Sequence, residues 1–421
     1  MIDVIRTPPI AAYDEKLEIF ANADTLQETV DAAIDKGISP AIVRWFSDPE
    51  YRATIIALME AGQYSIAPPH IVLIPKPGTN EQRKVYCNEA LDRVLCTQIG
   101  QTFQKMYGHL IHPSCVSYQK GIGVGQIVRR ISQYLTHNLG LVGAKFDIHH
   151  YFDDISEEAR DTALEELSTG SCIDSMVWDY LHDDTVIDEH GQIIRAYKGI
   201  AQGFALSPFL ANYLLRDIDA GMSAFDVVYY RYSDDILILG PDFEKARAFL
   251  YASLTDKGLK INPRKVVPID TNTPFTFLGF QIHGERITFS KDSLDRFKKK
   301  IRSHTKTRKG QPLKSKDVLK RAIHDINHEL YYAYMQNDRE FGWAEYMFGI
   351  VNVQEDIEML DKYIKDHLRH SYTGKWNSYG NYSKVPNDML KQCGYLSMVH
   401  LYKLYRIHKE LYRNEVRMRL A

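Results

Sequence analysis

Apolar residues recur at helical spacing towards both ends of this 421-residue chain and fall in short β-branched runs in its middle. Residues 14–62 carry apolar side chains every three or four positions and predict helices. Residues 70–76 and 82–87 flank the turn-forming PGTNE and predict a β-hairpin. Residues 88–140 return to helical spacing around the loop SYQKGIGVGQ.

The middle third of the chain alternates short strands with helices. Predicted strands lie in AKFDIHHYF, VVYYRYS, ILILG, LKINPRKV and FTFLGFQIHGERITF, and a further hairpin runs through DEHGQ. Helices are predicted over residues 157–167, 206–220 and 243–257, and nearly everything beyond Ser290 has helical spacing. Strands crossed by helices, with helices segregated to either end, predict an α+β catalytic core with helical flanks.

The composition is that of a globular protein, with 44% hydrophobic and 25% charged residues. The N-terminal residues lack a basic region followed by an apolar core, and no stretch of about 18 uncharged apolar residues occurs. Five cysteines are scattered without Cys-x-x-Cys spacing, so neither a zinc module nor a disulfide framework is indicated. We therefore expect a soluble, cytoplasmic protein without a membrane partner.

The charge is distributed unevenly, although the formal net charge is only -2. Residues 291–321 hold thirteen Lys or Arg against three Asp, which gives 13 − 3 = +10. A short charge run is usually a solvated helix face, but so lopsided a stretch favours contact with a phosphate backbone. The candidate nucleic-acid contacts are Lys298, Lys299, Lys300, Arg302, Arg308 and Lys309.

Two adjacent carboxylates, Asp234 and Asp235, lie between two predicted strands, where a tight hairpin would turn. Asp147 ends another predicted strand. Like charges repel in a partly desolvated place unless a cation is near, and strand-end carboxylates form an oxygen-only site suited to Mg²⁺. Asp is also a common turn residue, so this stretch alone leaves a metal site and a plain hairpin turn equally open.

The chain resembles the reverse transcriptases, because Tyr232-Ser233-Asp234-Asp235 is similar to their Tyr-x-Asp-Asp signature and further motifs accompany it in order over residues 70–280. These are VLIPKPGTNEQRKVYCNEALDRVL, SYQKGIGVGQIV, KFDIHHYFDDI, GIAQGFALSPFLANYLLRDID, and GLKINPRKV followed by FTFLGF. The resemblance implies a right-hand polymerase. Its expected parts are a helical N-terminus with fingers (1–140), a palm (141–285), a basic helical thumb (286–370) and a C-terminal helical extension (371–421).

The resemblance implies a role for individual residues around the predicted metal site. Asp147, Ile148 and Asp234 would hold two Mg²⁺ ions, for which Mn²⁺ could substitute, and Asp235 would be a nearby carboxylate of lesser role. Lys265 matches a lysine proposed to protonate pyrophosphate; a solvated lysine at a strand end is the alternative. Phe152 matches the ring that excludes a 2′-hydroxyl, although without the motif ordinary core packing would be the favoured explanation of this Phe.

Further matched positions would bind the nucleotide and the primer. Lys76 and Arg83 match the residues that clamp the incoming triphosphate, work for which a point charge and a bidentate fork are suited. The remaining matched nucleotide-binding residues are Gln202, Gly203 and Tyr232, and the matched primer grip is Phe277, Leu278 and Gly279.

The implied partners are an RNA template, a DNA product and deoxynucleoside triphosphates. The segment after Lys365 shows no paired cysteines and no H-x-x-x-N-like pattern, and no Val-Thr-Gly follows FLGFQIHGE. These departures favour a stand-alone bacterial enzyme of phage defence that copies a dedicated non-coding RNA over a retron or group II intron enzyme. Untemplated DNA synthesis stays open. Phe152 argues against an RNA-dependent RNA polymerase, and the intact acids argue against a purely RNA-binding protein.

Overall fold

The computed structural model describes residues 13–75, 82–119, 121–138, 140–196, 199–306, 314–331, 342–376 and 378–420. The chain forms two compact units. The first consists of residues 1–121 and 144–267, and the second of residues 122–143 and 268–421. Within the described ranges no helix is both long and apolar enough to cross a lipid bilayer.

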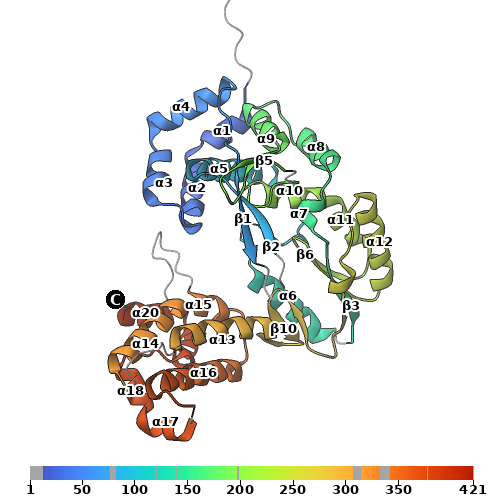
Figure 1. Ribbon diagram of the computed structural model, residues 1–421. Coiled ribbons are helices and arrows are strands. Elements are labelled where there is room, and N and C mark those ends of the chain that lie inside the picture. The colour runs from blue at the N-terminus through green and yellow to red at the C-terminus, as the bar shows by residue number, and fades with distance from the viewer. Residues whose placement is uncertain are drawn as a thin grey trace, which may run out of the picture. The chain divides into compact units, whose positions relative to one another are not determined.

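The first unit mixes helices with two small sheets (Figure 1). Its helices are α1 (Glu15–Ala21), α2 (Ala23–Asp35), α3 (Pro40–Phe46), α4 (Pro49–Glu60), α5 (Ala90–Tyr107), α7 (Tyr151–Asp154), α8 (Glu157–Glu166), α9 (Cys172–His182), α10 (Ser207–Leu214), α11 (Arg216–Gly221) and α12 (Phe243–Asp256). Short 3₁₀ turns are η1 (Gly108–Leu110), η2 (Met222–Ala224) and η3 (Pro263–Lys265). Its strands are β1 (His70–Pro75), β2 (Gln82–Cys87), most of β3 (Val142–Asp147), β4 (Thr185–Ile187), β5 (Ile193–Arg195), β6 (Val228–Tyr232) and β7 (Asp235–Leu239).

The N-terminal helices begin where a polar side chain caps a helix. Asn22 accepts from the Asp24 N–H, and Asp48 accepts from the N–H groups of Glu50 and Tyr51. Such caps satisfy N–H groups that have no partner inside the helix, and they divide the helical stretch at 14–62 into four helices. α1, α2 and α3 pack against α5.

Two sheets carry several of the candidate site residues of the first unit. One has the strand order β2-β1-β4-β5, in which β1 pairs with β2 antiparallel and Arg83 lies opposite Ile74. The other contains β6, β7 and β3 in that order, and β6 and β7 form an antiparallel hairpin. Ile236, Leu237, Ile238 and Leu239 of β7 are fully buried, so this strand runs through the core. The predicted hairpins at 70–87 and through DEHGQ are confirmed.

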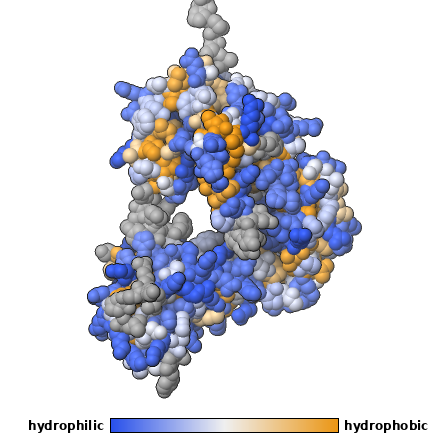
Figure 2. All heavy atoms as spheres, in the orientation of Figure 1, coloured by the Kyte–Doolittle hydropathy of each residue, from blue (hydrophilic) through white to orange (hydrophobic). Residues whose placement is uncertain are grey.

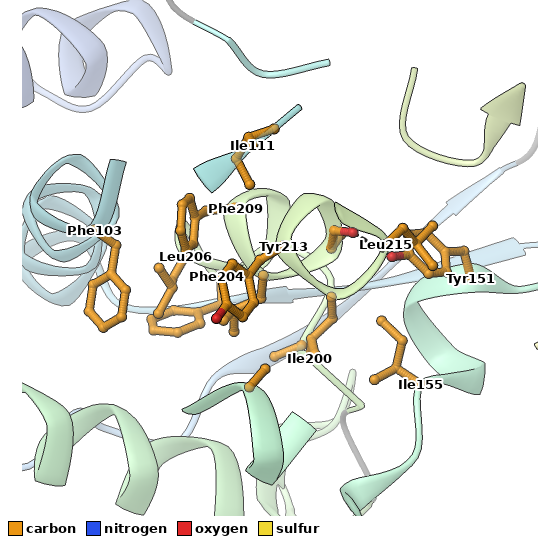
Figure 3. Packing of buried hydrophobic residues seen from close by; sticks show 14 of the residues in the cluster. Phe103, Ile111, Tyr151, Ile155, Ile200, Phe204, Leu206, Phe209, Tyr213 and Leu215 are labelled. Carbon is orange, nitrogen blue, oxygen red and sulfur yellow. Dashed lines mark hydrogen bonds between the residues drawn. The ribbon is translucent and has the colours of Figure 1, made fainter. Parts of the chain in front are cut away.

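Aromatic packing joins α5 to α10 in the core of the first unit. Phe209 and Tyr213 of α10 gather with Phe204, and Phe103 of α5 approaches Phe209 with a ring-centroid distance of 6.1 Å (Figure 3). All four side chains are nearly inaccessible to solvent. This packing fixes α10 and the loop before it, which contains Gln202.

Two predicted elements differ from the structure. Residues 206–220 form α10 and α11 instead of one helix, because side chains take the carbonyls that the helix would use: the Tyr151 hydroxyl bonds to Ala211 and the Arg231 guanidinium to Asn212. LKINPRKV is not a strand. It makes an isolated bridge between Ile261 and Ile148 and then the turn η3, where Pro263 has no N–H to continue a ladder.

The second unit is mainly helical, as predicted beyond Ser290. It contains α6 (Val124–His137), most of β8 (Val267–Asp270), β9 (Phe275–Phe277), β10 (Phe280–His283), β11 (Arg286–Phe289), α13 (Lys291–Thr305), α14 (Lys316–Tyr331), α15 (Trp343–Phe348), α16 (Gln354–Thr373), α17 (Ser378–Lys384), α18 (Asn387–Gln392), α19 (Met398–Ile407) and α20 (Lys409–Leu420). β9, β10 and β11 form an antiparallel sheet, and α6 packs on it. α13 packs beside α14 and α16, and the face of these helices seen in Figure 2 is mostly hydrophilic.

Candidate active site

The β6–β7 hairpin places the paired acids at its tip. Tyr232 and Asp235 are the last residue pair of the ladder, so Ser233 and Asp234 form a two-residue turn. Ser233 has a φ of 58°, the left-handed region that such a turn requires. Its N–H donates to the Ser117 hydroxyl at 2.9 Å, so a buried side chain holds the turn in place.

A backbone hydrogen bond brings the second acidic position to the same place. The Ile148 N–H donates to the Asp234 carbonyl at 3.0 Å, directly after β3 ends at Asp147. A second backbone hydrogen bond holds the end of β3, because the Asn262 N–H donates to the Asp147 carbonyl at 2.8 Å. Asp147 and Asp234 therefore lie at neighbouring strand ends, as the sequence predicts.

The charges at this site are only partly neutralised by the protein. Burial, and then the negative charges of Asp147 and Asp235, raise the pKa of Asp234 above its usual value. The Lys265 ammonium lies 2.8 Å from Asp147, and the Lys145 ammonium lies 3.1 Å from Asp235. Among the described residues no Lys, Arg or His forms a direct ion pair with Asp234, and the charge of the nearby Lys265 only partly offsets the effects that raise its pKa.

This donor set fits a hard divalent cation. The carboxylates of Asp147 and Asp234 and the backbone carbonyl of Ile148 offer oxygen ligands only, the type that Mg²⁺ prefers. In the part of the chain that the structure describes, no three His, Cys, Asp or Glu side chains converge as a ready-made metal cage. A bound ion would therefore need further oxygen ligands, such as water or phosphate, which is how Mg²⁺ is usually held beside nucleotides.

A buried ion pair lies immediately behind the hairpin. Arg231 and Asp219 are both fully buried, and the Arg231 Nε donates to Asp219 Oδ1 at 2.8 Å. The Tyr229 hydroxyl donates to the same oxygen at 2.7 Å. Burial by itself lowers the pKa of Arg231, but the charge and hydrogen bonds of Asp219 raise it well above its usual value. Arg231 therefore stays charged inside the core.

Arg231 also supports the turn that carries Asp234. Its guanidinium donates to the Ser233 carbonyl at 3.3 Å and to the Asn212 carbonyl at 3.2 Å. The Asn212 side chain in turn accepts from the Ser117 hydroxyl at 2.9 Å and donates to the Ser117 carbonyl at 2.8 Å. Ser233 is thus bonded through both its N–H and its carbonyl to one buried network. Sequence reasoning missed this network, for which the only signal was a lone Arg inside a strand otherwise typical of the core.

The loop with Gln202 and Gly203 packs against β2. The Gln202 carbonyl accepts from the Tyr86 N–H at 2.7 Å. Gly203 has a φ of 115°, and a side chain there would overlap the Tyr86 carbonyl oxygen. Only glycine allows this approach. On the same strand the side chain of Arg83 is exposed, whereas Lys76 lies outside the described residues.

Phe152 and Tyr232 are both partly buried. Phe152 lies on α7 and packs against the core, while part of its ring stays accessible. Tyr232 closes the hairpin, and its ring centroid lies 6.1 Å from that of Tyr118. Core packing and a contact with nucleotide are therefore compatible for Phe152.

The remaining predicted residues belong to the second unit. Phe277 is fully buried, and Leu278 and Gly279 form a turn with φ values of 48° and 85°, so a primer could be contacted there mainly through the backbone. Lys298, Lys299, Lys300 and Arg302 lie on α13, where Lys300 forms an ion pair with Glu329. Arg308 and Lys309 lie outside the described residues.

Comparison with known families decides the class of the fold around these acids. Residues 74–282 match the family described as reverse transcriptase (RNA-dependent DNA polymerase). The chain carries a reverse transcriptase domain. The resemblance that the motifs predict is confirmed for a reverse transcriptase domain. The α+β polymerase fold is confirmed as well. Enzymes of this family use divalent metal ions.

Known proteins similar to part of this chain include two viral polyproteins. The chain is 39% identical over 107 residues to the Gag-Pro-Pol polyprotein of Simian retrovirus SRV-2, covering 24% of this chain and 6% of the polyprotein. It is 39% identical over 100 residues to that of Mason-Pfizer monkey virus, covering 23% and 6%. The chain thus spans only a small part of the length of these relatives.

Solved structures with a similar arrangement include polymerases of other kinds. Apo telomerase from Candida tropicalis matches with a TM-score of 0.47 and 14% identity, over 85% of this chain and 62% of that one. The RNA-dependent RNA polymerase of a human picorbirnavirus, an insertion loop deletion mutant, matches with a TM-score of 0.44 and 15% identity, over 77% and 64%.

Proposed function

We propose that this protein is an RNA-directed DNA polymerase that joins deoxynucleotides to a primer 3′-hydroxyl in the presence of Mg²⁺. The observation that carries the proposal is the junction of Asp147 and Asp234 by the Ile148 hydrogen bond, within a matched reverse transcriptase domain. The lack of a direct ion-pair partner for Asp234 among the described residues supports a cation at this place. A plain hairpin turn needs only Asp234 and Asp235. Neither such a turn nor a purely structural role requires Asp147 to lie beside them.

Each residue of the site has a role in this proposal. Asp147, Asp234 and the Ile148 carbonyl hold the metal, and Asp235 is kept beside them by Lys145. When bound, two Mg²⁺ ions would activate the attacking hydroxyl and stabilise the departing pyrophosphate. Lys265, more than half exposed and paired with Asp147, is placed to give a proton to that leaving group.

The nucleotide would be bound from the β2 side of the site. Arg83 offers an exposed guanidinium for the triphosphate, and Lys76 is proposed to act with it. Phe152 excludes a 2′-hydroxyl, which makes deoxynucleotides the preferred substrate. Gln202 and Gly203 hold the loop beside the base, and Tyr232 closes the hairpin below it.

We further propose that the enzyme serves bacterial antiphage defence by copying an associated non-coding RNA. This step rests on the lack of a Val-Thr-Gly after FLGFQIHGE, which favours the defence type over a retron enzyme. Retron-like, intron-like and untemplated DNA synthesis are the alternatives within the same chemistry. RNA binding without catalysis is the alternative outside it.

Sequencing of co-purified nucleic acid tests these proposals together. The wild type and the double variant Asp234→Ala, Asp235→Ala are purified from the native host, with the exposed Asp256→Asn as a matched control. We expect one enriched RNA in all three proteins, and its complementary DNA only in the wild type and the control. DNA of simple composition without a matching RNA would support untemplated synthesis. Equal RNA and no DNA in any of the three would contradict polymerase function.

A further inference from the structure

An exposed tryptophan stands at the end of a row of aromatic rings in the second unit. Trp376 follows α16 and is 63% exposed, the largest exposed fraction of the four tryptophans. Its indole stacks on the His370 ring with a centroid distance of 4.0 Å and an interplanar angle of 12°. One partner therefore holds the ring, while most of its surface stays accessible to a further stacking partner.

The row continues along α16 towards α13. His367 meets the edge of Trp376 at 4.7 Å, and Tyr363 lies 4.0 Å from His367. Burial lowers the pKa of both His367 and His370, so these rings are neutral at pH 7 and pack as aromatic groups. His367 is further fixed by a hydrogen bond between its Nδ1 and the Tyr363 carbonyl at 3.0 Å. The ring that meets the edge of Trp376 is therefore held in place by a hydrogen bond to its own helix.

Cations flank the aromatic row. The Lys298 ammonium lies 5.7 Å from the centre of the Tyr363 ring, and an Arg302 nitrogen donates to the Tyr363 hydroxyl at 3.3 Å. Lys362 and Lys375 are exposed beside Tyr363 and Trp376 in the sequence. The nearby Asp366 is engaged by Arg369 at 3.2 Å, so it does not cancel these charges. α13 and α16 lie side by side, which makes the row and its cations one surface (Figure 1).

We propose that this surface binds single-stranded nucleic acid, with one unpaired base stacked on the exposed face of Trp376 and the flanking phosphates on Lys298, Arg302 and Lys375. Stacking needs an open base face, which a base in a duplex does not offer, so the ligand is a single strand. Phosphates satisfy the row of cations. This proposal adds a binding site to the proposed polymerase. The purpose of the site rests on the proposed function, whereas the contacts that define the site do not.

Binding of short labelled oligonucleotides tests the site directly. Fluorescein-labelled oligouridylate and oligothymidylate are titrated with the whole protein and its variants, and affinity is read from anisotropy. We expect Trp376→Ala to weaken binding about tenfold, since one base stack is lost, and Trp376→Phe to keep most of it. Trp45→Ala removes another exposed tryptophan, 55% accessible, and should change nothing. A larger loss for oligouridylate assigns the site to RNA, and equal losses assign it to either strand.

Tryptophan fluorescence gives a second measurement that does not depend on the alanine variant folding. Oligouridylate should quench the emission of the wild type and of Trp45→Phe, and most of this quenching should disappear in Trp376→Phe. Lys298→Ala should lower the slope of log affinity against log salt by about 0.7, the value for one phosphate contact on a single strand.

The proposal is overturned if Trp376→Ala binds both oligonucleotides like the wild type and Trp376→Phe is quenched equally. The exposed indole would then be assigned to a protein contact instead. Asp234→Ala separates this outcome from failure of the proposed function, because it should abolish nucleotide incorporation and leave oligonucleotide binding and quenching unchanged. Trp376-dependent binding without incorporation in the wild type would refute the polymerase and keep the binding site.

Discussion

The Ile148 N–H is bonded to the Asp234 carbonyl at 3.0 Å, and this single contact sets the geometry of the candidate active site. It joins the end of β3, where Asp147 lies, to the tip of the β6–β7 hairpin. Two carboxylates that are 87 positions apart in the sequence, since 234 − 147 = 87, thereby become neighbours. Burial, and then the negative charges of Asp147 and Asp235, raise the pKa of Asp234, and a bound cation would offset both effects.

The buried pair behind the hairpin should carry a large share of the stability of the first unit. Arg231→Met leaves the Asp219 carboxylate uncompensated in the core, so we expect the free energy of unfolding to fall by about 3–5 kcal/mol. The double variant Arg231→Met, Asp219→Leu should recover most of this loss, because both charges are then gone. Urea unfolding measures the three proteins. A single variant within about 1 kcal/mol of the wild type would contradict the importance of the pair.

The same double variant separates stability from positioning. It restores the core but not the bonds from Arg231 to the carbonyls of Ser233 and Asn212. We therefore expect a stable protein that needs more Mg²⁺ for half-maximal incorporation, because the turn with Asp234 is less firmly held. A Mg²⁺ dependence identical to that of the wild type would show that Arg231 is structural only.

Lys265 should affect turnover more than nucleotide affinity. If it gives a proton to the leaving group, Lys265→Ala lowers kcat about 100-fold with little change in KM for the nucleotide. Lys265→Arg keeps a cation beside Asp147 but does not release its proton, so it should be slow as well. Exposed Lys260→Ala is the matched control. Wild-type kcat in the arginine variant would reduce the lysine to a partner of Asp147.

Phe152 should control the choice of sugar. Phe152→Ala opens space for a 2′-hydroxyl, so the ratio of kcat/KM for a deoxynucleotide to that for the matching ribonucleotide is expected to fall at least about tenfold. Single-nucleotide incorporation measures the ratio. Loss of thermal stability with an unchanged ratio would assign the ring to core packing alone, in line with its contacts to the core.

Gly203 should tolerate no side chain. Gly203→Ala combines a φ of 115° with a clash against the backbone of Tyr86, and we expect a destabilisation of more than about 2 kcal/mol. Gly191→Ala, with a φ of 78° but open space around it, should lose only about 1 kcal/mol. Thermal unfolding compares the two. Equal losses of stability would show that the loop with Gly203 can move away from β2 without an energetic cost.

The sequence predicts those elements whose local pattern agrees with their packing. Alternation and turn residues mark the β1–β2 and β6–β7 hairpins, and the order of the acids marks the site. Residues 206–220 have helical spacing throughout, yet the helix is interrupted because Tyr151 and Arg231 bond to its carbonyls. Such bonds come from residues distant in the sequence, so no local pattern announces them.

The buried polar residues were the least predictable part of the site. Arg and Asp usually lie on the protein surface, and only the fold shows that Arg231 and Asp219 form a buried ion pair. Asn212 and Ser117 support the turn that carries Asp234 through bonds between segments 95 positions apart. The sequence draws attention to the acids because adjacent like charges between two predicted strands repel each other. The buried residues that support them are hydrogen-bonded in the fold, and no local sequence pattern reveals those bonds.

The most direct test of the central claim is Mg²⁺-dependent incorporation of a labelled deoxynucleotide on an RNA template with a DNA primer. Wild type and Asp256→Asn should incorporate label with a saturable Mg²⁺ dependence, and Asp147→Asn and Asp234→Asn should each lose it while remaining folded. Incorporation by the two active-site variants at the wild-type rate, or none by a folded wild type over the whole Mg²⁺ range, would contradict a metal-dependent polymerase site at Asp147 and Asp234.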